Sequence, residues 1–356
     1  MTGPASIRIG IVGATGLVGR ELLGLIEKRK FPLRELRLFA SRARRRRVPF
    51  RGQSVPVGAA EIDPLLSCSL VFFASSDEVS ARLAKTLADR GVWVIDDSSA
   101  FRLSPGVPLV IPEVNARALT RAARLISGPN CTMTGLAVAA HPFLQRYGIV
   151  QVRVASYQSV SGAGKEALEE FRGQSRSLAG RWGGDEVDFP RLSFPRASAL
   201  PAAIASNVIP QVGPFGPAGY SGEEEKVTKE LRKVWGLPRL AVSVTAVRVP
   251  VLRGHSLAAW ITLKKPAPIE EAERLLKKAP GLKYLSLPSY PTPLAASGRE
   301  PVFAGRLRRG IGAREICLWI VSDNLLKGAA LNSIQIAEEL LRRGWLGAEG
   351  PMRPQA

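Results

Sequence analysis

The chain contains one cysteine whose surroundings favour a nucleophile. Cys131 lies in the polar segment SGPNCTMTG at 127–135, and apolar residues at helical spacing follow it. This pattern predicts a helix that begins here, with Asn130 as its N-cap. The dipole and the free N–H groups of a helix N-terminus stabilise a thiolate, which is the nucleophilic form. Cys68 and Cys317 lie in or beside apolar runs, and we expect them to be inert core residues.

A thiolate nucleophile needs a group that transfers protons, and the chain has two histidines. His141 lies farther along the helix predicted to begin at Cys131, at a separation of about 15 Å along the axis. Its ring is therefore out of reach of the thiol, and we expect it to be structural. His255 lies at a turn between two predicted strands, where a loop side chain can act as a general acid and base.

A glycine-rich turn, GATGLVG at 13–19, joins a buried strand-like segment at 7–12 to the start of a helix. Glycines let the backbone turn tightly and approach a pyrophosphate, and the helix N-terminus offers N–H groups and a positive dipole. The alternative is a structural turn without a ligand. The strand before the motif and the helix after it favour a dinucleotide site.

The residues after the next predicted strand favour NADP over NAD. An NAD site usually places an Asp or Glu about twenty residues beyond the glycine motif, where it holds the ribose 2′-hydroxyl. No carboxylate occurs between Leu36 and Ala60, and the strand ends at Ser41 and Arg42. A guanidinium binds a 2′-phosphate through charge-assisted hydrogen bonds. Of the arginines at 42–47 we expect one or two to contact the cofactor and the others to face solvent.

Together, a thiol nucleophile and NADP predict a redox reaction of an aldehyde. The thiolate adds to the carbonyl to give a thiohemiacetal, hydride leaves to the nicotinamide, and a thioester remains on Cys131. His255 takes the proton from the hemiacetal oxygen and returns one in the reverse direction. Phosphate, water or coenzyme A would cleave the thioester, and the residues considered so far leave these acceptors open.

The composition sets the class of protein that must position these groups. The 356 residues suggest two or three domains, and 46% hydrophobic with 22% charged residues is typical of a globular protein with a large core. No apolar run approaches the ~18 residues of a membrane span, and the first residues lack a signal-peptide pattern. Three cysteines are typical of a reducing compartment. We therefore expect a cytoplasmic protein without a metal centre or a membrane partner.

The charge is unusual, because 50 Lys and Arg against 30 Asp and Glu leave a net charge of +20. Such an excess favours acidic partners, from nucleic acids to small anions. It is spread along the chain rather than gathered in a tail, which is also typical of a proteome-wide bias towards Arg. A basic nucleic-acid binder remains the alternative of a different class. The pair of Cys131 and His255 favours the enzyme, because a binder has no use for it.

The order of predicted elements indicates an α/β protein. Short buried strands alternate with helices as far as about residue 130, which predicts an N-terminal Rossmann-like, doubly wound parallel sheet. Longer strands with alternating apolar residues follow and predict an α+β domain with a mixed sheet. Residues 173–220 form a long excursion rich in Gly, Pro, Ser and Arg, typical of an interface or a lid. A helix is predicted over 325–343.

Seven ordered motifs resemble the bacterial aspartate-semialdehyde dehydrogenase family over about residues 7–339. They are GATG at 13–16, SSAFR at 98–102, GPNC at 128–131, YQSVSGAG at 157–164, RVPV at 248–251, GHS at 254–256 and VSDNLLKGAA at 321–330. The resemblance implies an NADP-binding domain at 1–130, a catalytic and dimerisation domain at 131–322, and a C-terminal helix at 323–356 that packs back on the first domain. It also implies a homodimer or homotetramer.

The resemblance assigns roles to individual residues. It makes Cys131 the nucleophile, His255 the acid and base, and Gln158 a residue that orients the substrate at the thiol. The residues implied to bind substrate are Arg248 for its carboxylate, Glu223 for its ammonium group, and Lys226, Arg102 and Asn130 for phosphate. Those implied to line the NADP site are Gly13, Thr15, Gly16, Leu17, Val18, Ser41, Arg42, Ser161, Gly162 and Asn324.

Two of these assignments compete with structural interpretations. Arg248 could be an outward-facing strand residue, because apolar Val247 and Val249 flank it. Residues 221–224 also match a capping box, which predicts a structural role for Glu224.

The implied reaction is the NADPH-dependent conversion of aspartyl phosphate to aspartate semialdehyde through a thioester on Cys131. This reaction feeds the synthesis of lysine, threonine and methionine. No nucleic acid takes part in it. A related reductase that uses an acyl-coenzyme A donor is the nearest alternative.

Overall fold

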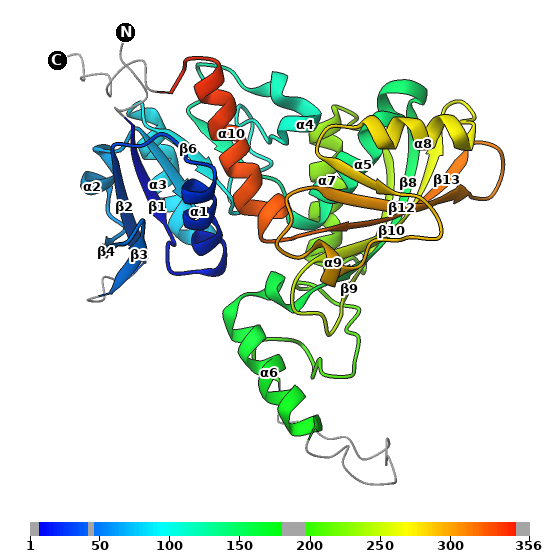
Figure 1. The fold of residues 1–356 in the computed structure, drawn as a ribbon, viewed down its shortest axis with the longest axis horizontal. Helices are drawn as coiled ribbons and strands as arrows, with labels where there is room; N and C mark the ends of the chain where they lie inside the picture. Colours follow the sequence, from blue (N-terminus) through cyan, green and yellow to red (C-terminus); the bar gives the residue numbers. More distant parts are fainter. Residues whose placement is uncertain (1–6, 42–45, 180–196, 347–356) are drawn as a thin grey trace. The chain divides into compact units, whose positions relative to one another are not determined.

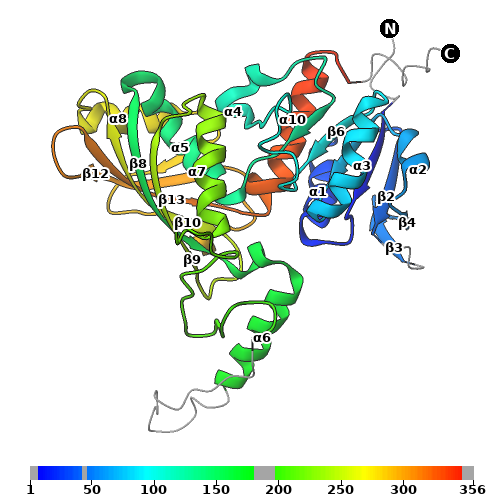
Figure 2. The ribbon, with the colours of Figure 1, turned by 180° about the vertical axis from the view of Figure 1, so that it is seen from behind.

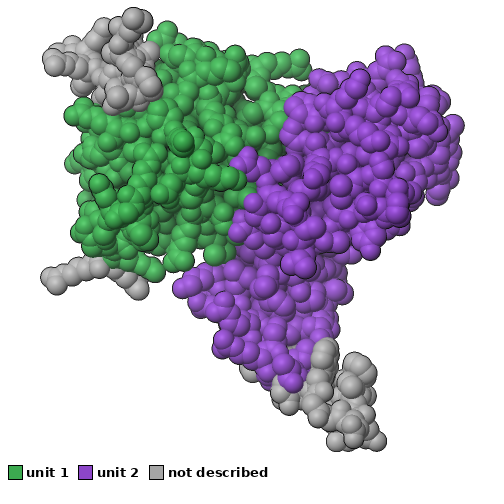
Figure 3. Space-filling view, in the orientation of Figure 1, with its two compact units in different colours: residues 1–138, 229–238, 325–356 green, residues 139–228, 239–324 purple. Residues whose placement is uncertain are grey.

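A computed structural model describes residues 7–41, 46–179 and 197–346, and the chain divides into two compact units (Figure 3). The first unit contains residues 1–138, 229–238 and 325–356, and the second contains 139–228 and 239–324. That residues 229–238 belong with the first unit was not predicted from the sequence.

The first unit is built on a sheet that, within the described residues, has seven strands in the order β3-β4-β2-β1-β5-β6-β7 (Figure 1). All neighbouring strands are parallel except β3 and β4. Its elements are β1 (Arg8–Val12), α1 (Leu17–Lys28), β2 (Glu35–Ala40), β3 (Arg47–Phe50), β4 (Gln53–Ala59), α2 (Ile62–Leu66), β5 (Leu70–Phe73), α3 (Asp77–Asp89), β6 (Trp93–Asp96), α4 (Pro112–Asn115), η2 (Ala116–Ala118), β7 (Leu125–Ser127), η5 (Leu326–Ala330) and α10 (Leu331–Arg342).

Both faces of this sheet are buried, as expected for parallel strands joined by helices. Ile9 and Phe72 face a core shared with α1, η5 and α10, whereas Val71 and Phe73 face α2 and α3. Helices α1 and α10 lie side by side although they come from opposite ends of the chain (Figures 1 and 2). The helix predicted over 325–343 is interrupted in its first turns, because η5 is a π-helix that continues directly into α10.

The second unit contains a mixed sheet whose described strands follow the order β11-β12-β13-β10-β8-β9. Only the pairs β8–β9 and β11–β12 are parallel. Its elements are η3 (Val160–Ala163), β8 (Ile149–Gln158), α6 (Lys165–Ala179), β9 (Ala241–Arg248), β10 (His255–Leu263), α8 (Ile269–Lys278), β11 (Leu282–Leu285), α9 (Pro293–Ala296), β12 (Val302–Arg309) and β13 (Glu315–Ser322). Two helices contribute to both units, namely α5 (Cys131–Tyr147) and α7 (Gly222–Trp235).

Apolar and polar residues alternate along the strands of the mixed sheet, so that one face is buried and the other is more open. Val152 and Val154 of β8 are buried, whereas Arg153 and Tyr157 are exposed. Alternation of this kind is typical of a half-covered sheet.

The predicted fold class is confirmed: a mostly parallel, doubly covered sheet and a second unit with a mixed sheet. No helix among the described residues is both long enough and apolar enough to cross a membrane. The same residues contain no cluster of three or more His, Cys, Asp or Glu side chains arranged to hold a metal ion.

Candidate active site

Cys131 is the first residue of α5, and its thiol is partly buried. The Oδ1 atom of Asn130 accepts hydrogen bonds from the N–H groups of Thr132 (2.8 Å) and Met133 (3.0 Å). This is the capping arrangement predicted for Asn130. The cap fixes the backbone on both sides of Cys131 and leaves its side chain at the positive end of the helix dipole.

The π-helix η5 approaches the thiol residue closely. A Cβ atom added to Gly328 would lie 2.7 Å from the Cβ of Cys131, so only glycine leaves room at this position. The preceding residue, Lys327, is 1% exposed. Its ammonium group donates hydrogen bonds to Glu113 (2.6 Å), Gln335 (2.6 Å) and Asn332 (3.0 Å). A buried ammonium with three acceptors is a firm attachment, and it fixes η5 to α4 and α10.

Arg102 is a second buried cation of this unit, with 8% of the residue exposed. Its Nη1 donates to Glu230 Oε1 (3.1 Å) and its Nη2 donates to the carbonyl oxygen of Asp97 (2.7 Å). Its Nε is buried and has no hydrogen-bond partner among the described residues. Burial lowers the pKa of Arg102, but the negative charge of Glu230 and, to a smaller extent, that of the Cys131 thiolate raise it. The net result is a pKa above the ordinary value. An unsatisfied N–H near the thiol is a donor suited to an anionic ligand.

Asp97 is a second unusual group beside Arg102. Its Oδ1 accepts a hydrogen bond from Ser333 (2.6 Å), whereas its Oδ2 is buried without a partner among the described residues. Burial raises the pKa of this carboxyl group to about 7, and the neighbouring Asp96 adds to the increase. A substantial fraction of Asp97 is therefore protonated at neutral pH.

Asp97→Asn tests this with stability measurements. The folded pKa of about 7 lies above the ordinary 3.8, so the folded state binds more protons between these values. The free energy of unfolding contributed by Asp97 therefore falls as pH rises from about 4 to 7, by at most about 1.4 kcal/mol per unit. The difference in stability, variant minus wild type, should increase over this range and level off above pH 8 in urea titrations. Parallel curves would show that Asp97 is ionised throughout.

In the second unit, the ring of His255 is fully buried at the start of β10. The N–H group of Ser159 donates to its Nδ1 (3.1 Å). Since Nδ1 is thereby an acceptor, the neutral ring carries its proton on Nε2. Burial and the positive charge of Arg248 lower the pKa of His255 to about 3, so the ring is neutral at physiological pH.

Arg248 and Gln158 are brought together with this ring. The guanidinium Nη1 of Arg248 donates to the carbonyl oxygen of Ser159 (2.7 Å), and the residue is 5% exposed. It lies on the buried face of β9 with Val244 and Ala246, so the outward-facing interpretation is wrong. A Cβ atom added to Gly162 would lie 3.0 Å from Arg248 Nη1 and 3.1 Å from His255 Cε1, which shows how closely η3 approaches both side chains.

Gln158 and Glu223 are in direct contact. The Nε2 of Gln158, itself 2% exposed, donates to Glu223 Oε1 (3.0 Å). Lys226 is exposed on the same helix. The structural role predicted for Glu224 is confirmed, because it accepts the N–H of Ser221 (2.6 Å) and also that of Ala246 (2.8 Å). Only this half of the predicted capping box forms, since the hydroxyl of Ser221 has no hydrogen-bond partner among the described residues.

Asn324 holds the loop that carries His255. Its Oδ1 accepts the N–H of Gly254 (2.9 Å) and the hydroxyl of Ser159 (3.1 Å), and its Nδ2 donates to Ser161 (3.0 Å). The residue is 2% exposed. The roles predicted for Ser161, Gly162 and Asn324 at the cofactor remain predictions, but the three residues do surround the histidine.

The glycine motif has the geometry of a close-packed turn. Gly13 has φ +86°, and a Cβ atom there would lie 2.2 Å from the carbonyl oxygen of Ala74. A Cβ atom on Gly19 would lie 2.3 Å from the carbonyl oxygen of Gly13. The N-cap of α1 is Gly16, which has no side chain. The N–H groups of the first turn are therefore not bound by a capping side chain. These features fit a bound pyrophosphate. Ser41 is exposed just after β2, and Arg42 lies outside the described residues.

Three residues around the thiol were missed in the sequence: Asp97, Glu230 and Lys327. Glu230 had a detectable signal, because it lies two helical turns after Glu223 on the same face of the predicted helix. Lys327 had none, since a lysine in an apolar segment does not reveal its partners.

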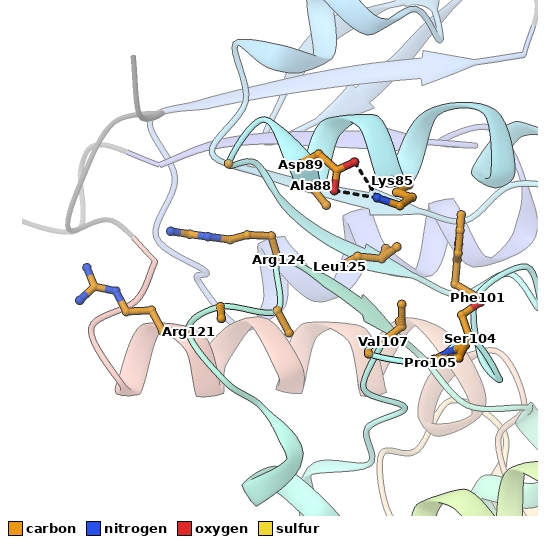
Figure 4. A pocket seen from close by; sticks show the side chains of 14 residues that line it. Lys85, Ala88, Asp89, Phe101, Ser104, Pro105, Val107, Arg121, Arg124 and Leu125 are labelled. Carbon is orange, nitrogen blue, oxygen red and sulfur yellow. Dashed lines mark hydrogen bonds and ion pairs between the residues drawn. The ribbon is translucent and has the colours of Figure 1, made fainter. Parts of the chain in front are cut away.

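The first unit also has a surface pocket of about 650 Å³ away from this chemistry (Figure 4). Phe101, Arg121, Arg124 and the Lys85–Asp89 ion pair line it. None of the predicted site residues does.

Comparisons with known proteins give one family. The description "Semialdehyde dehydrogenase, NAD binding domain" matches residues 8–122, and "Semialdehyde dehydrogenase, dimerisation domain" matches residues 141–327. An aspartate-semialdehyde dehydrogenase of Synechocystis is 40% identical over 96% of this chain and 100% of its own length, and one of Bacillus subtilis is 38% identical over 94% and 97%. The crystal structure of aspartate semialdehyde dehydrogenase II complexed with ASA from Vibrio cholerae superposes with a TM-score of 0.88 at 35% identity, covering 95% of this chain and 98% of that one.

Proposed function

Since this chain belongs to the aspartate-semialdehyde dehydrogenase family, we propose that it reduces L-4-aspartyl phosphate to L-aspartate 4-semialdehyde and phosphate with NADPH. The observation that carries the proposal is Cys131 at the capped N-terminus of α5, in the same unit as the buried Arg102. The product would feed lysine, threonine and methionine synthesis.

Cys131 begins the reaction as a thiolate. It attacks the acyl carbon of aspartyl phosphate, the bond to the phosphate oxygen breaks, and a thioester forms on Sγ. When bound, NADPH supplies a hydride to the thioester carbonyl. The resulting thiohemiacetal gives up the aldehyde as the carbon–sulfur bond breaks and the thiolate returns. In the opposite direction phosphate cleaves the thioester.

His255 acts on the oxygen of the reacting carbonyl. Its neutral ring presents Nε2–H as a donor, which suits an oxygen on which negative charge develops. Ser159 and Asn324 hold the ring and its loop in this orientation. In the oxidative direction, Nε2 receives the proton of the hemiacetal hydroxyl in the tautomer that carries the ring's own proton on Nδ1, where the hydroxyl oxygen of Ser159 lies 3.1 Å away.

Charged and polar side chains recognise the three charged groups of the substrate. The unsatisfied Nε–H of Arg102 is offered to a phosphate oxygen, and Asn130 and Lys226 act with it. Arg248 binds the α-carboxylate with the guanidinium N–H groups that it does not use for Ser159. Glu223 binds the ammonium group, and Gln158, whose amide donates a hydrogen bond to this carboxylate, orients the substrate.

The cofactor site is that of the glycine turn, and we assign it to NADP. Gly13, Thr15, Gly16, Leu17 and Val18 would surround the pyrophosphate, and Ser41 and Arg42 the 2′-phosphate. Exposed Ser41 follows β2, and the neighbouring described residues 46–60 contain no carboxylate.

Arg42→Glu should raise the KM for NADP by at least about tenfold and change the KM for NAD little, because a carboxylate repels the 2′-phosphate and can accept a ribose 2′-hydroxyl. Initial rates with both nucleotides measure the effect. Equal losses with NADP and NAD would contradict an arginine contact to the 2′-phosphate.

A progress curve decides the reaction. Aspartate semialdehyde and NADP should give NADPH only when phosphate is present, and coenzyme A in place of phosphate should give no sustained turnover. Turnover with coenzyme A would favour the acyl-coenzyme A alternative. Absence of turnover with either acceptor would overturn the proposed function.

The more open face of the mixed sheet is the surface that we assign to a second copy of the chain. Tyr157 and Trp319 pack together there, with ring centroids 5.5 Å apart and ring planes tilted by 46°. Arg153 and Tyr157 are exposed beside half-buried Trp260. Aromatic side chains and Arg are typical of protein interfaces. Light scattering of the purified protein measures whether it is a dimer or a tetramer.

A further inference from the structure

Glu230 is a buried carboxylate with two different partners at the thiol. It lies on α7 and is 1% exposed. One oxygen, Oε1, accepts a hydrogen bond from Arg102 (3.1 Å), and the other, Oε2, accepts the backbone N–H of Asn130 (2.7 Å). The carboxylate of Glu230 therefore connects Arg102, which is proposed to bind phosphate, to Asn130, the residue that precedes the nucleophile.

The first contact fixes the orientation of Arg102. With Nη1 bound to Glu230 and Nη2 bound to the carbonyl oxygen of Asp97, the plane of the guanidinium has little freedom. Lys233, one turn after Glu230, holds the carbonyl oxygen of Arg102 itself (2.7 Å). Nε is the guanidinium nitrogen that has no hydrogen-bond partner among the described residues.

The second contact fixes the N-cap of α5. Asn130 uses its side chain to bind the N–H groups of Thr132 and Met133, and its own N–H is held by Glu230. Movement of Glu230 would therefore shift the cap and, with it, Cys131. A displacement of about 1 Å at a reacting atom can reduce a rate about a hundredfold.

We propose that Glu230 is a positioning residue that holds Arg102 and the cap of Cys131 in one arrangement and balances the charge of Arg102 beside the thiol. This inference rests on the proposed function, because it takes Cys131 as the nucleophile and Arg102 as a phosphate ligand. Glu230 itself does not touch the reacting atoms.

Charge balance follows from the groups around the thiol. Arg102 stabilises the thiolate, while Glu230 opposes this effect by neutralising Arg102. The other charged groups that contact or interact with Arg102 are Asp96, Asp97, which is partly protonated, and Lys233. Removing the charge of Glu230 leaves Arg102 without its hydrogen-bonded carboxylate next to the sulfur. An opposite charge at short range lowers an acidic pKa by about one unit or more.

Glu230→Gln therefore has an effect that a purely structural role would not produce. We expect the pKa of the Cys131 thiol, measured by the pH dependence of iodoacetamide alkylation, to fall by about one unit. The KM for phosphate should fall, and kcat should fall about tenfold to a hundredfold because the amide cannot hold both partners as the carboxylate does. Lower kcat with an unchanged thiol pKa would overturn the charge role.

Glu224→Gln is the matched control. Glu224 is a buried carboxylate on the same helix that also accepts two N–H groups, Ser221 and Ala246, both in the second unit. This variant should keep the thiol pKa of the wild type. An equal shift in Glu224→Gln would overturn the assignment to Glu230.

Glu230→Asp separates charge from reach, and it also serves if Glu230→Gln fails to fold. The shorter carboxylate keeps the charge but cannot span Arg102 and the Asn130 N–H, so the thiol pKa should stay near that of the wild type while kcat falls. Wild-type kcat and phosphate KM in this variant would overturn the positioning role. Alkylation needs no turnover, so it tests Glu230 even if the progress curve overturns the proposed function.

Discussion

Replacement of Cys131 by serine should remove nearly all turnover, with a loss in kcat of about a thousandfold or more. A serine hydroxyl is not ionised at neutral pH, and the helix N-terminus and Arg102 that favour a thiolate cannot supply the missing base. The side chain is nearly the same size, so the cap by Asn130 and the contact with Gly328 should persist. NADPH binding, measured by fluorescence titration, should therefore be unchanged.

Cys68→Ser and Cys317→Ser serve as controls. Both thiols are buried, and burial raises the pKa of Cys68 to about 11 and also raises that of Cys317. Neither thiol reacts as a thiolate at neutral pH, so alkylation of the native protein should label Cys131 alone. Residual activity of Cys131→Ser above a tenth of the wild type would contradict the nucleophile.

Replacement of His255 by asparagine should reduce kcat by about a hundredfold to ten-thousandfold. Asparagine retains a short polar side chain that can accept the N–H of Ser159, but it has no ring nitrogen to exchange protons with the hemiacetal oxygen. Because the pKa of His255 is lowered to about 3, the ring is already neutral above about pH 4. The titration of His255 should therefore cause no inflection in the plot of kcat/KM against pH between pH 5 and 8. Any inflection that the wild type shows in this range should also be present in His255→Asn.

His141→Asn is the matched control, since His141 lies within α5 in the sequence and was predicted to be structural. Its kcat should stay within about twofold of the wild type, as is usual for residues away from the chemistry. If both histidine variants lost activity equally, the decrease would reflect stability rather than proton transfer.

Much of the site could be predicted because its signals are local. The turn at 13–19 needs glycine at positions where a Cβ atom would collide with nearby backbone, and the cap of α5 involves residues adjacent in sequence. Alternating strands and helices likewise predict a parallel sheet from short-range patterns.

The rest depends on contacts between distant parts of the chain. Arg102 and Glu230 meet across 128 positions, and Lys327 and Glu113 across 214. Nothing near either residue identifies its partner. Alternation along β9 predicts that Arg248 lies on the opposite face of the sheet from Val247 and Val249. It does not predict which of the two faces is covered, because the neighbouring elements decide that.

The path of the chain through the two units limits how the protein can be cut for recombinant work. A gene that stopped at residue 138 would omit η5 and α10, and Ile9 and Phe72 would then face water where Leu331 and Ile334 belong. Such a fragment would expose a broad apolar surface and aggregate. An expressible nucleotide-binding piece would need both residues 229–238 and the C-terminal segment supplied in the same polypeptide, for example joined through short linkers to the end of the first segment.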